Sequence, residues 1–204
     1  MAKILVFDFD GTLADSKQLY LWAINSFLLR NGYRISKKVV AKNLGPRLDV
    51  MLINLGVRKK DLAKIQQEIN LAVVKKATTL EICPYVKSTL KRLSSKHILT
   101  LITNSKGSFV KRFLLKHNLL NYFSELSCAE FKTKDKAFRH LFKKYAVKPP
   151  EVIYIADKKE DIAIAKRVGC KVIIVLSRAW DRKAFKQLNK YKECTIRNLK
   201  ELNL

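Results

Sequence analysis

Two aspartates near the start of the chain, Asp8 and Asp10, have the residue type and the spacing that many catalytic sites use. They end a short apolar run, Lys3–Phe7, which is typical of a buried strand. Side chains two residues apart point to the same side of an extended chain, and Gly11 then allows the backbone to turn sharply. Two neighbouring carboxylates repel each other unless a cation or a shared proton relieves them. The pair therefore indicates metal binding, nucleophilic attack or proton transfer.

Five further polar residues stand beside the ends of later apolar runs: Thr103, Asn104, Lys134, Asp157 and Asp161. In a parallel sheet the carboxyl ends of the strands share one edge, so these side chains can converge with the first pair. Taken singly, each signal is weak, because an aspartate or threonine after a strand is commonly a turn or cap residue. Their order around one expected sheet is far more specific and indicates a single site.

The segments that must position these residues predict an α/β protein. Helical patterns follow the first strand at 16–31, 36–43, 47–55 and 59–78, with Ser16 as the expected cap of the first helix. From residue 84 onward, helices expected at 85–96, 108–117, 134–145 and 160–168 alternate with strands expected at 98–102, 126–129, 152–156 and 171–176. This alternation is typical of parallel βαβ units. We therefore expect a Rossmann-like parallel sheet with helices on both faces, formed by residues 1–15 and 81–204, and an all-helical insertion at 16–80.

The length and composition exclude several classes of protein. With 204 residues, 48% of them hydrophobic, the chain can bury a core and is not expected to be disordered. Its longest uncharged stretch, Gln18–Leu29, has twelve residues and is too short to span a bilayer. The four cysteines lie far apart, which argues against structural zinc and for reduced thiols. We therefore expect a cytoplasmic protein with no membrane association.

The charge balance is extreme, with 42 Lys+Arg against 17 Asp+Glu and a net charge of +25. One interpretation is a polyanionic partner such as RNA or DNA. The other is a general lysine bias, which we favour because the basic residues are scattered in short pairs and form no single tail. The expected consequence is weak, nonspecific binding to nucleic acids.

The segment Asp8–Leu13 reads Asp-Phe-Asp-Gly-Thr-Leu and resembles the first motif of the haloacid dehalogenase-like hydrolase superfamily, Asp-x-Asp-Gly-Thr-Leu. The following Ala14-Asp15-Ser16 is similar to the phosphoglycolate phosphatase-like branch. Thr103 at a strand end matches the second motif, and Asp157 with Asp161 resembles the fourth, Gly-Asp-x-x-x-Asp. The resemblance covers nearly the whole chain.

The match is less specific at two places. The third motif is a lysine, for which Lys134 has the expected spacing to the fourth motif, while Lys132 and Lys136 remain alternatives. Ala156 stands where the family usually has glycine, and its methyl group could crowd the loop or require another backbone angle. Because Asp157 and Asp161 keep their spacing, we expect the alanine to be tolerated.

The resemblance implies a Mg²⁺-dependent phosphatase that hydrolyses a small phosphorylated metabolite, similar to phosphoglycolate, through an aspartyl-phosphate intermediate. Asp8 is then the nucleophile, and Asp10 protonates the leaving alcohol and later activates water. The metal ligands it implies are Asp8, Asp10 (through its backbone carbonyl) and Asp157, while Asp161 either binds the metal through water or orients Lys134. Thr103 and Lys134 neutralise the phosphoryl oxygens.

The helical insertion resembles the small α-helical cap of the family, which covers the sheet edge and contacts the leaving group. The residues expected to bind the substrate are Gly11, Asn104 and Arg47, the last from the loop 44–47. Arg47 could hold a second anionic group of the substrate, or it could be a solvated helix-end residue. The sequence leaves open a phosphomutase, a pyrophosphatase, or a basic nucleic-acid-binding protein on a retained phosphatase fold. It also leaves the oligomeric state open.

Overall fold

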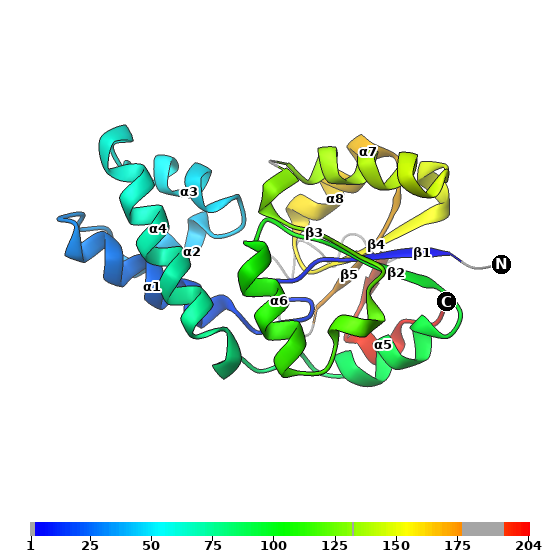
Figure 1. Cartoon of the computed structure of the whole chain (residues 1–204). Helices are drawn as coiled ribbons and strands as arrows, with labels where there is room; N and C mark the ends of the chain where they lie inside the picture. The colour runs from blue at the N-terminus through cyan, green and yellow to red at the C-terminus, as the bar shows by residue number, and fades with distance from the viewer. Residues whose placement is uncertain (1–2, 132, 177–193) are drawn as a thin grey trace.

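The centre of the molecule is a six-stranded parallel sheet with the strand order β3-β2-β1-β4-β5-β6 (Figure 1). This computed structural model describes residues 3–131, 133–176 and 194–204. The strands are β1 (Ile4–Phe7), β2 (Ile98–Ile102), β3 (Glu125–Ser127), β4 (Val152–Ala156), β5 (Lys171–Val175) and β6 (Thr195–Ile196). Since β1 lies between β2 and β4, the chain reverses its direction of travel across the sheet beside β1, which is where ligand sites of open α/β sheets occur.

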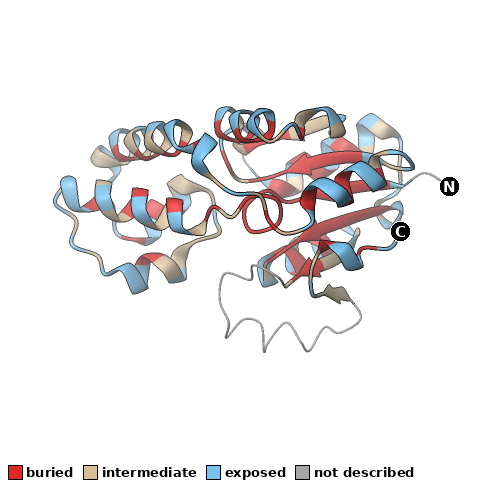
Figure 2. Cartoon of the chain, turned by 90° about the horizontal axis from the view of Figure 1, so that it is seen from below, coloured by how far each residue is buried: buried red, intermediate tan, exposed pale blue. Residues whose placement is uncertain are grey.

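Helices cover both faces of this sheet, as the sequence predicts. In Figure 1, α5 (Val86–Ser94) and α6 (Gly107–Lys116) lie below the strands, and α7 (Lys134–Tyr145) and α8 (Lys159–Val168) lie above them. Alternate residues of β1 face opposite sides, so Leu5 and Phe7 join one apolar cluster while Ile4 and Val6 join another. Both faces of the central strands β1 and β4 are buried (red in Figure 2), which is why these strands are continuous apolar runs.

A second group of helices lies beside the carboxyl ends of the strands. It consists of α1 (Lys17–Arg30), α2 (Lys37–Asn43), α3 (Leu48–Asn54) and α4 (Lys59–Lys75), followed by the 3₁₀ helix η1 (Ala77–Thr79) (Figure 1). These elements occupy the segment in which an all-helical insertion is expected, and we refer to them as the cap. Their apolar faces belong to the same cluster of buried residues as Leu5 and Phe7. No helix of the described residues combines the length and the apolar composition of a membrane span.

The two chain segments that connect the cap to the sheet are hydrogen-bonded to each other. Ala14 and Ile82 form an antiparallel bridge. The amide of Asp15 donates to the carbonyl of Glu81 at 3.1 Å, and the amide of Cys83 donates to the carbonyl of Leu13 at 2.8 Å. The outgoing and returning segments therefore form one short paired strap.

The structure departs from the predicted elements at a few ends. The helix predicted at 59–78 ends at Lys75, because Thr78 and Thr79 are poor helix formers and Ala77 turns into the core, where it is fully buried. The strand predicted at 126–129 is β3, which begins and ends earlier because Glu125 pairs with Thr100 of β2. The short strand β6 was not predicted, since two residues show no periodicity.

Ala156, at the end of β4, has a backbone that alanine adopts without strain. Among the described non-glycine residues, only Tyr85, Asn118 and Ala146 have positive φ angles. The Ala156 side chain is fully buried in the cluster that contains Val6. The methyl group thus contributes to packing at this position.

We predict that Ala156→Gly lowers the free energy of unfolding by about 1–2 kcal/mol, from the lost methyl burial and the added backbone freedom of glycine. Urea unfolding of the two proteins measures the difference. A variant that is more stable than the parent would show that the methyl group strains the strand end.

Candidate active site

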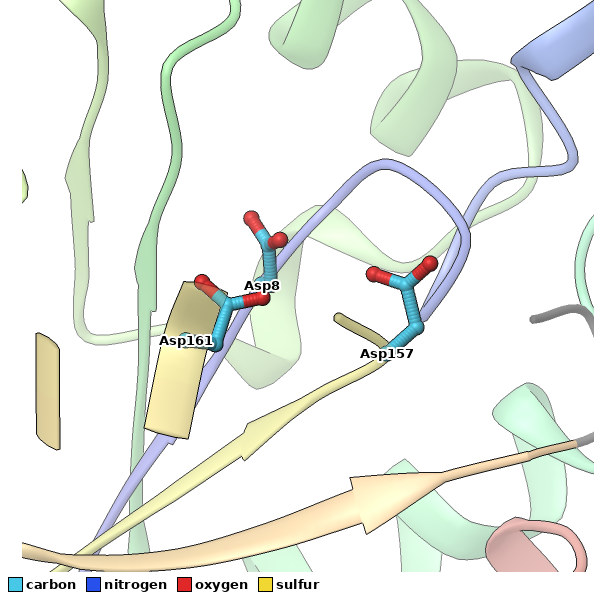
Figure 3. A group of neighbouring side chains, drawn as sticks. All are labelled: Asp8, Asp157 and Asp161. Atoms are coloured by element: carbon cyan, nitrogen blue, oxygen red, sulfur yellow. The ribbon is translucent and has the colours of Figure 1, made fainter. Parts of the chain in front are cut away.

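Three strand ends bring the predicted site residues to one edge of the sheet. Asp8 follows β1, Asp157 follows β4 and Asp161 lies on α8 (Figure 3). Thr103 follows β2. The ladder continues one residue past each of the first two strands, since the amide of Asp8 donates to Ile155 and that of Thr103 to Ser127. These main-chain hydrogen bonds therefore fix the Cα positions of Asp8 and Thr103.

Asp8, Asp157 and Asp161 form a compact acidic cluster. One oxygen from each lies within 4.8 Å of those of the other two, and the residues are only 3%, 1% and 2% exposed, respectively. Both carboxylate oxygens of Asp157 and the Oδ2 atom of Asp161 are buried without a hydrogen-bond partner. Buried carboxylates in this state are costly unless a cation contacts them. A set of oxygen ligands of this kind fits Mg²⁺.

Lys134 supplies a positive charge beside the cluster. Its Nζ atom lies 3.0 Å from Oδ2 of Asp8 and 2.9 Å from Oδ1 of Asp161. The lysine is the first residue of α7, and the Thr133 side chain caps that helix by accepting from the Lys136 amide. Burial alone lowers the pKa of Lys134, but Asp161 and Asp8 raise it more, so the ammonium stays protonated.

Of the three candidate lysines, Lys134 is the one that the structure places at the acidic cluster. Lys136 is exposed to solvent. Lys132 lies outside the described residues.

Tyr154, which the sequence analysis did not single out, completes the surroundings of Lys134. The tyrosine hydroxyl accepts from Nζ of Lys134 at 2.6 Å and donates to Oδ1 of Asp161 at 2.8 Å. Burial raises the pKa of Tyr154 well above its ordinary value, so the hydroxyl keeps its proton. Inside an apolar strand, a tyrosine looks like a core residue. The available signal was that a buried tyrosine hydroxyl usually finds a polar partner.

Burial makes ionisation of two members of the cluster, Asp8 and Asp157, less favourable than in solution. Burial raises the pKa of Asp8 to about 6, with Lys134 opposing and Asp161 adding to the shift. Burial also raises the pKa of Asp157 well above its ordinary range, with Lys158 opposing this shift. A bound cation would reverse this preference by stabilising the ionised forms.

Asp10 points away from the acidic cluster toward the cap. Gly11, at a φ of 81°, turns the chain here, and its amide donates to the carbonyl of Ala14. Oδ1 of Asp10 accepts from the hydroxyl of Ser16 and Oδ2 from that of Ser105, both at 2.5 Å. Ser16 was predicted to cap α1. It stands at that position, but its side chain makes no cap hydrogen bond because it contacts Asp10.

A hydroxyl chain links Asp10 to the first cap helix. The Tyr20 hydroxyl on α1 lies 2.8 Å from Oγ of Ser105. Because Ser105 donates its proton to Asp10, Tyr20 is the donor to Ser105. Asp10 is therefore held by groups from both sides of the cap–sheet boundary.

The cap loop 44–47 contacts the sheet edge. Nδ2 of Asn104 donates to the carbonyl of Gly45 at 3.2 Å, and Nη1 of Arg47 donates to the carbonyl of Ala129 at 2.8 Å. The remaining contacts of the Arg47 guanidinium are with Asp49, whose two oxygens accept from Nε and Nη2. The structure thus brings Asn104 and Arg47 to the site, with the charge of Arg47 balanced by a carboxylate of the cap.

Comparison with protein families shows which family has a sequence like that of this chain. Residues 5–175 match the family described as "Haloacid dehalogenase-like hydrolase". The chain belongs to that family. The match includes β1, the cap and the sheet through β5, so every site residue described above lies within it. By family the chain is a hydrolase, and the curated relatives named below are phosphatases.

Among curated proteins, the hydrolase is similar to phosphoglycolate phosphatases. It is 28% identical over 187 residues to the one from Aliivibrio fischeri, covering 82% of this chain and 81% of the relative. It is 27% identical over 188 residues to one from Haemophilus influenzae, covering 84% of each. The resemblance to this branch is thereby confirmed.

Solved structures share the fold. A haloacid dehalogenase-like hydrolase from Streptococcus pneumoniae has a TM-score of 0.84 at 19% identity, covering 98% of this chain and 96% of its own. CbbY from Rhodobacter sphaeroides, solved in complex with phosphate, has a TM-score of 0.82 at 16% identity, covering 100% and 97%. The predicted Rossmann-like fold class is confirmed.

We predict that Asp157→Asn stabilises the metal-free hydrolase at pH 7. The raised folded-state pKa values mean that the folded protein loses stability as these carboxyls ionise; for Asp8 this occurs as the pH rises from 3.8 toward about 6. Asparagine at position 157 carries no charge. The substitution should therefore raise the free energy of unfolding by about 1.4 kcal/mol for each unit by which folding raises the pKa of Asp157. Thermal unfolding in excess chelator measures the difference, which should shrink at pH 4.

The same measurement with Mg²⁺ provides the control. The ion should raise the unfolding temperature of the parent protein and have little effect on Asp157→Asn. If the variant is less stable than the parent in chelator at pH 7, burial of the Asp157 carboxylate does not destabilise the metal-free protein.

Proposed function

We propose that this hydrolase cleaves a small phosphomonoester in a Mg²⁺-dependent reaction that passes through a phosphorylated Asp8. The observation that carries the proposal is the position of Asp8, which is buried at a strand end with one oxygen held by Lys134 and a second aspartate two residues later. A fixed carboxylate beside a protonated lysine is suited to attack an anionic phosphoryl group.

The first step forms one bond and breaks one. A carboxylate oxygen of Asp8 attacks phosphorus, and the ester bond to the leaving oxygen breaks. Asp10, in its protonated form, gives its proton to that oxygen and releases an alcohol. Lys134, Thr103 and Asn104 carry the side chains available to bind the phosphoryl oxygens, whereas the Gly11 amide is already bonded to the carbonyl of Ala14.

The second step restores Asp8. Asp10 is now ionised and accepts a proton from water, whose oxygen attacks phosphorus while the bond to Asp8 breaks. The products are inorganic phosphate, free Asp8 and protonated Asp10. The hydroxyls of Ser16 and Ser105 hold Asp10 in place for both proton transfers.

The acidic cluster fits Mg²⁺, and we propose that Asp8, Asp157 and the backbone carbonyl of Asp10 hold the ion, with Asp161 contributing through water. When bound, the ion supplies positive charge that offsets the repulsion between the Asp8 carboxylate and the phosphate dianion. Tyr154 and Lys134 fix Oδ1 of Asp161, which leaves its Oδ2 atom directed to the site.

Phosphoglycolate is the first substrate to test, because the curated relatives are phosphoglycolate phosphatases. A phosphomutase or a pyrophosphatase uses the same first step. Release of inorganic phosphate without an isomeric phosphoester distinguishes the phosphatase from the mutase, and comparison with pyrophosphate distinguishes it from the pyrophosphatase.

We predict that Asp8→Asn lowers kcat by at least about a thousandfold, because the amide cannot form the acyl phosphate. Phosphate release from p-nitrophenyl phosphate in the presence of Mg²⁺ measures the loss. Asp135→Asn is the matched control, since Asp135 forms an exposed ion pair with Arg167 outside the site. Activity of Asp8→Asn close to that of the control would exclude Asp8 as the nucleophile.

We predict that the activity lost in Asp10→Asn grows with the pKa of the leaving alcohol. A poor leaving group depends on protonation in the transition state, whereas p-nitrophenol does not. A series of aryl and alkyl phosphates of different leaving-group pKa measures the slope. An equal loss across the series would argue against Asp10 as the general acid.

The proposed location is the cytoplasm. None of the four cysteines, which are Cys83, Cys128, Cys170 and Cys194, is in a disulfide, and a reducing compartment is compatible with this state.

We expect the net charge of +25 to cause weak, sequence-independent binding to RNA and DNA, separate from catalysis. Such binding should fall steeply between low and physiological salt through counterion release, while turnover of a small substrate changes much less. A salt titration of both on one preparation tests this. Tight binding that persists at physiological salt and prefers one sequence would instead make nucleic acid a functional partner.

A further inference from the structure

A cavity of about 320 Å³ lies between the cap and the sheet edge. Asp10 lines it, so it adjoins the group that we propose as the donor of the leaving-group proton. Its other walls include the loop 44–47, α4 of the cap, and residues 104–106 after β2. Its volume falls in the range of sites that enclose a whole small molecule, which is more than a two-carbon leaving group requires.

The charged residues of this cavity balance one another. Three are acidic and three are basic: Asp10, Asp49, Glu130, Arg47, Lys106 and Lys158. Arg47 and Asp49 are joined by two hydrogen bonds of 3.1 and 3.2 Å. An anionic leaving group would therefore meet a guanidinium that is already paired with a carboxylate. The two lysines of the lining are matched in number by the two remaining acidic residues, so the lining carries no net positive charge.

Two carboxamides of α4 line the cavity and have no hydrogen-bond partner among the residues that the structure describes. Gln66 and Asn70 are four residues apart, which places them on one face of the helix, and both line the cavity. Neither side chain makes a hydrogen bond to another of the described residues, although both are partly buried. Each carboxamide offers donors and an acceptor. Hydroxyl groups, which both donate and accept, match such a pair.

We propose that this cavity binds an uncharged, hydroxyl-rich leaving group of sugar or polyol size, with Gln66 and Asn70 as the residues that recognise its hydroxyls. The inference rests on the proposed phosphatase function and narrows its substrate class to sugar or polyol phosphates. The paired charges of Arg47 and Asp49 disfavour a carboxylate at the same place. The open hydrogen-bonding groups of α4 give affinity only to a substrate long enough to reach them.

The first experiment compares three substrates of the parent enzyme with Mg²⁺: ribose 5-phosphate, sorbitol 6-phosphate and 2-phosphoglycolate, with p-nitrophenyl phosphate as a generic reporter. We expect kcat/KM for the better polyol substrate to exceed that for 2-phosphoglycolate by at least about tenfold. If p-nitrophenyl phosphate is cleaved but 2-phosphoglycolate is preferred, this inference fails and the proposed function stands. If none of the four is cleaved, both fail.

The second experiment uses Gln66→Leu and Asn70→Leu, with Gln67→Leu as the matched control because Gln67 is exposed on the same helix and does not line the cavity. Each cavity variant should lower the ratio of kcat/KM for the polyol phosphate to that for 2-phosphoglycolate by about tenfold, and the control should not change it. Thermal unfolding confirms that the variants fold. An unchanged ratio in both cavity variants would overturn the role assigned to α4.

A third variant, Asp49→Asn, tests whether the pairing of Arg47 with Asp49 disfavours an anionic leaving group. Asp49→Asn removes the carboxylate that pairs with Arg47 and should raise kcat/KM for 2-phosphoglycolate relative to the polyol phosphate. If Asp49→Asn leaves that ratio unchanged or lowers it, pairing with Asp49 is not what disfavours an anionic leaving group.

Discussion

The mutual repulsion of three buried carboxylates, Asp8, Asp157 and Asp161, is the constraint that the surrounding structure must satisfy. Parallel strands create it, because their carboxyl ends share one edge of the sheet. Lys134 offsets part of the negative charge, and the unpartnered oxygens of Asp157 leave a place for a divalent cation. The same buried carboxylates that we propose for catalysis therefore lower the free energy of unfolding when no metal is bound.

The two aspartates of the first motif, Asp8 and Asp10, lie in different surroundings. Asp8 lies among charges, where burial and neighbours decide its ionisation. Asp10, two residues later, lies among hydroxyls of Ser16 and Ser105 and outside the acidic cluster. The chain bends at Phe9, between the two carboxylates that an extended chain would have kept on one side. Different surroundings suit the two residues to different steps of one reaction.

The sequence was sufficient for the sheet, the helices and the residues at strand ends, because apolar periodicity and strand order are local or topological properties. It was insufficient for contacts between distant segments. The bond from Tyr154 to Asp161 depends on how α8 packs on β4, and the pairing of Arg47 with Asp49 depends on a loop conformation that no periodicity describes. The strand β6 was not predicted because two residues are too few to show an apolar periodicity.

The paired strap between the cap and the sheet has a mechanical consequence. Because the two connections are hydrogen-bonded to each other beside Ala14 and Ile82, a displacement of one connection would also displace the other. Ser16 and Tyr20 lie immediately beyond that strap and hold Asp10 directly and through Ser105. A displacement of the cap would therefore move the residues that hold Asp10, the proposed general acid. The contacts that hold Asp10 therefore depend on the position of the same cap whose loop 44–47 and α4 line the cavity.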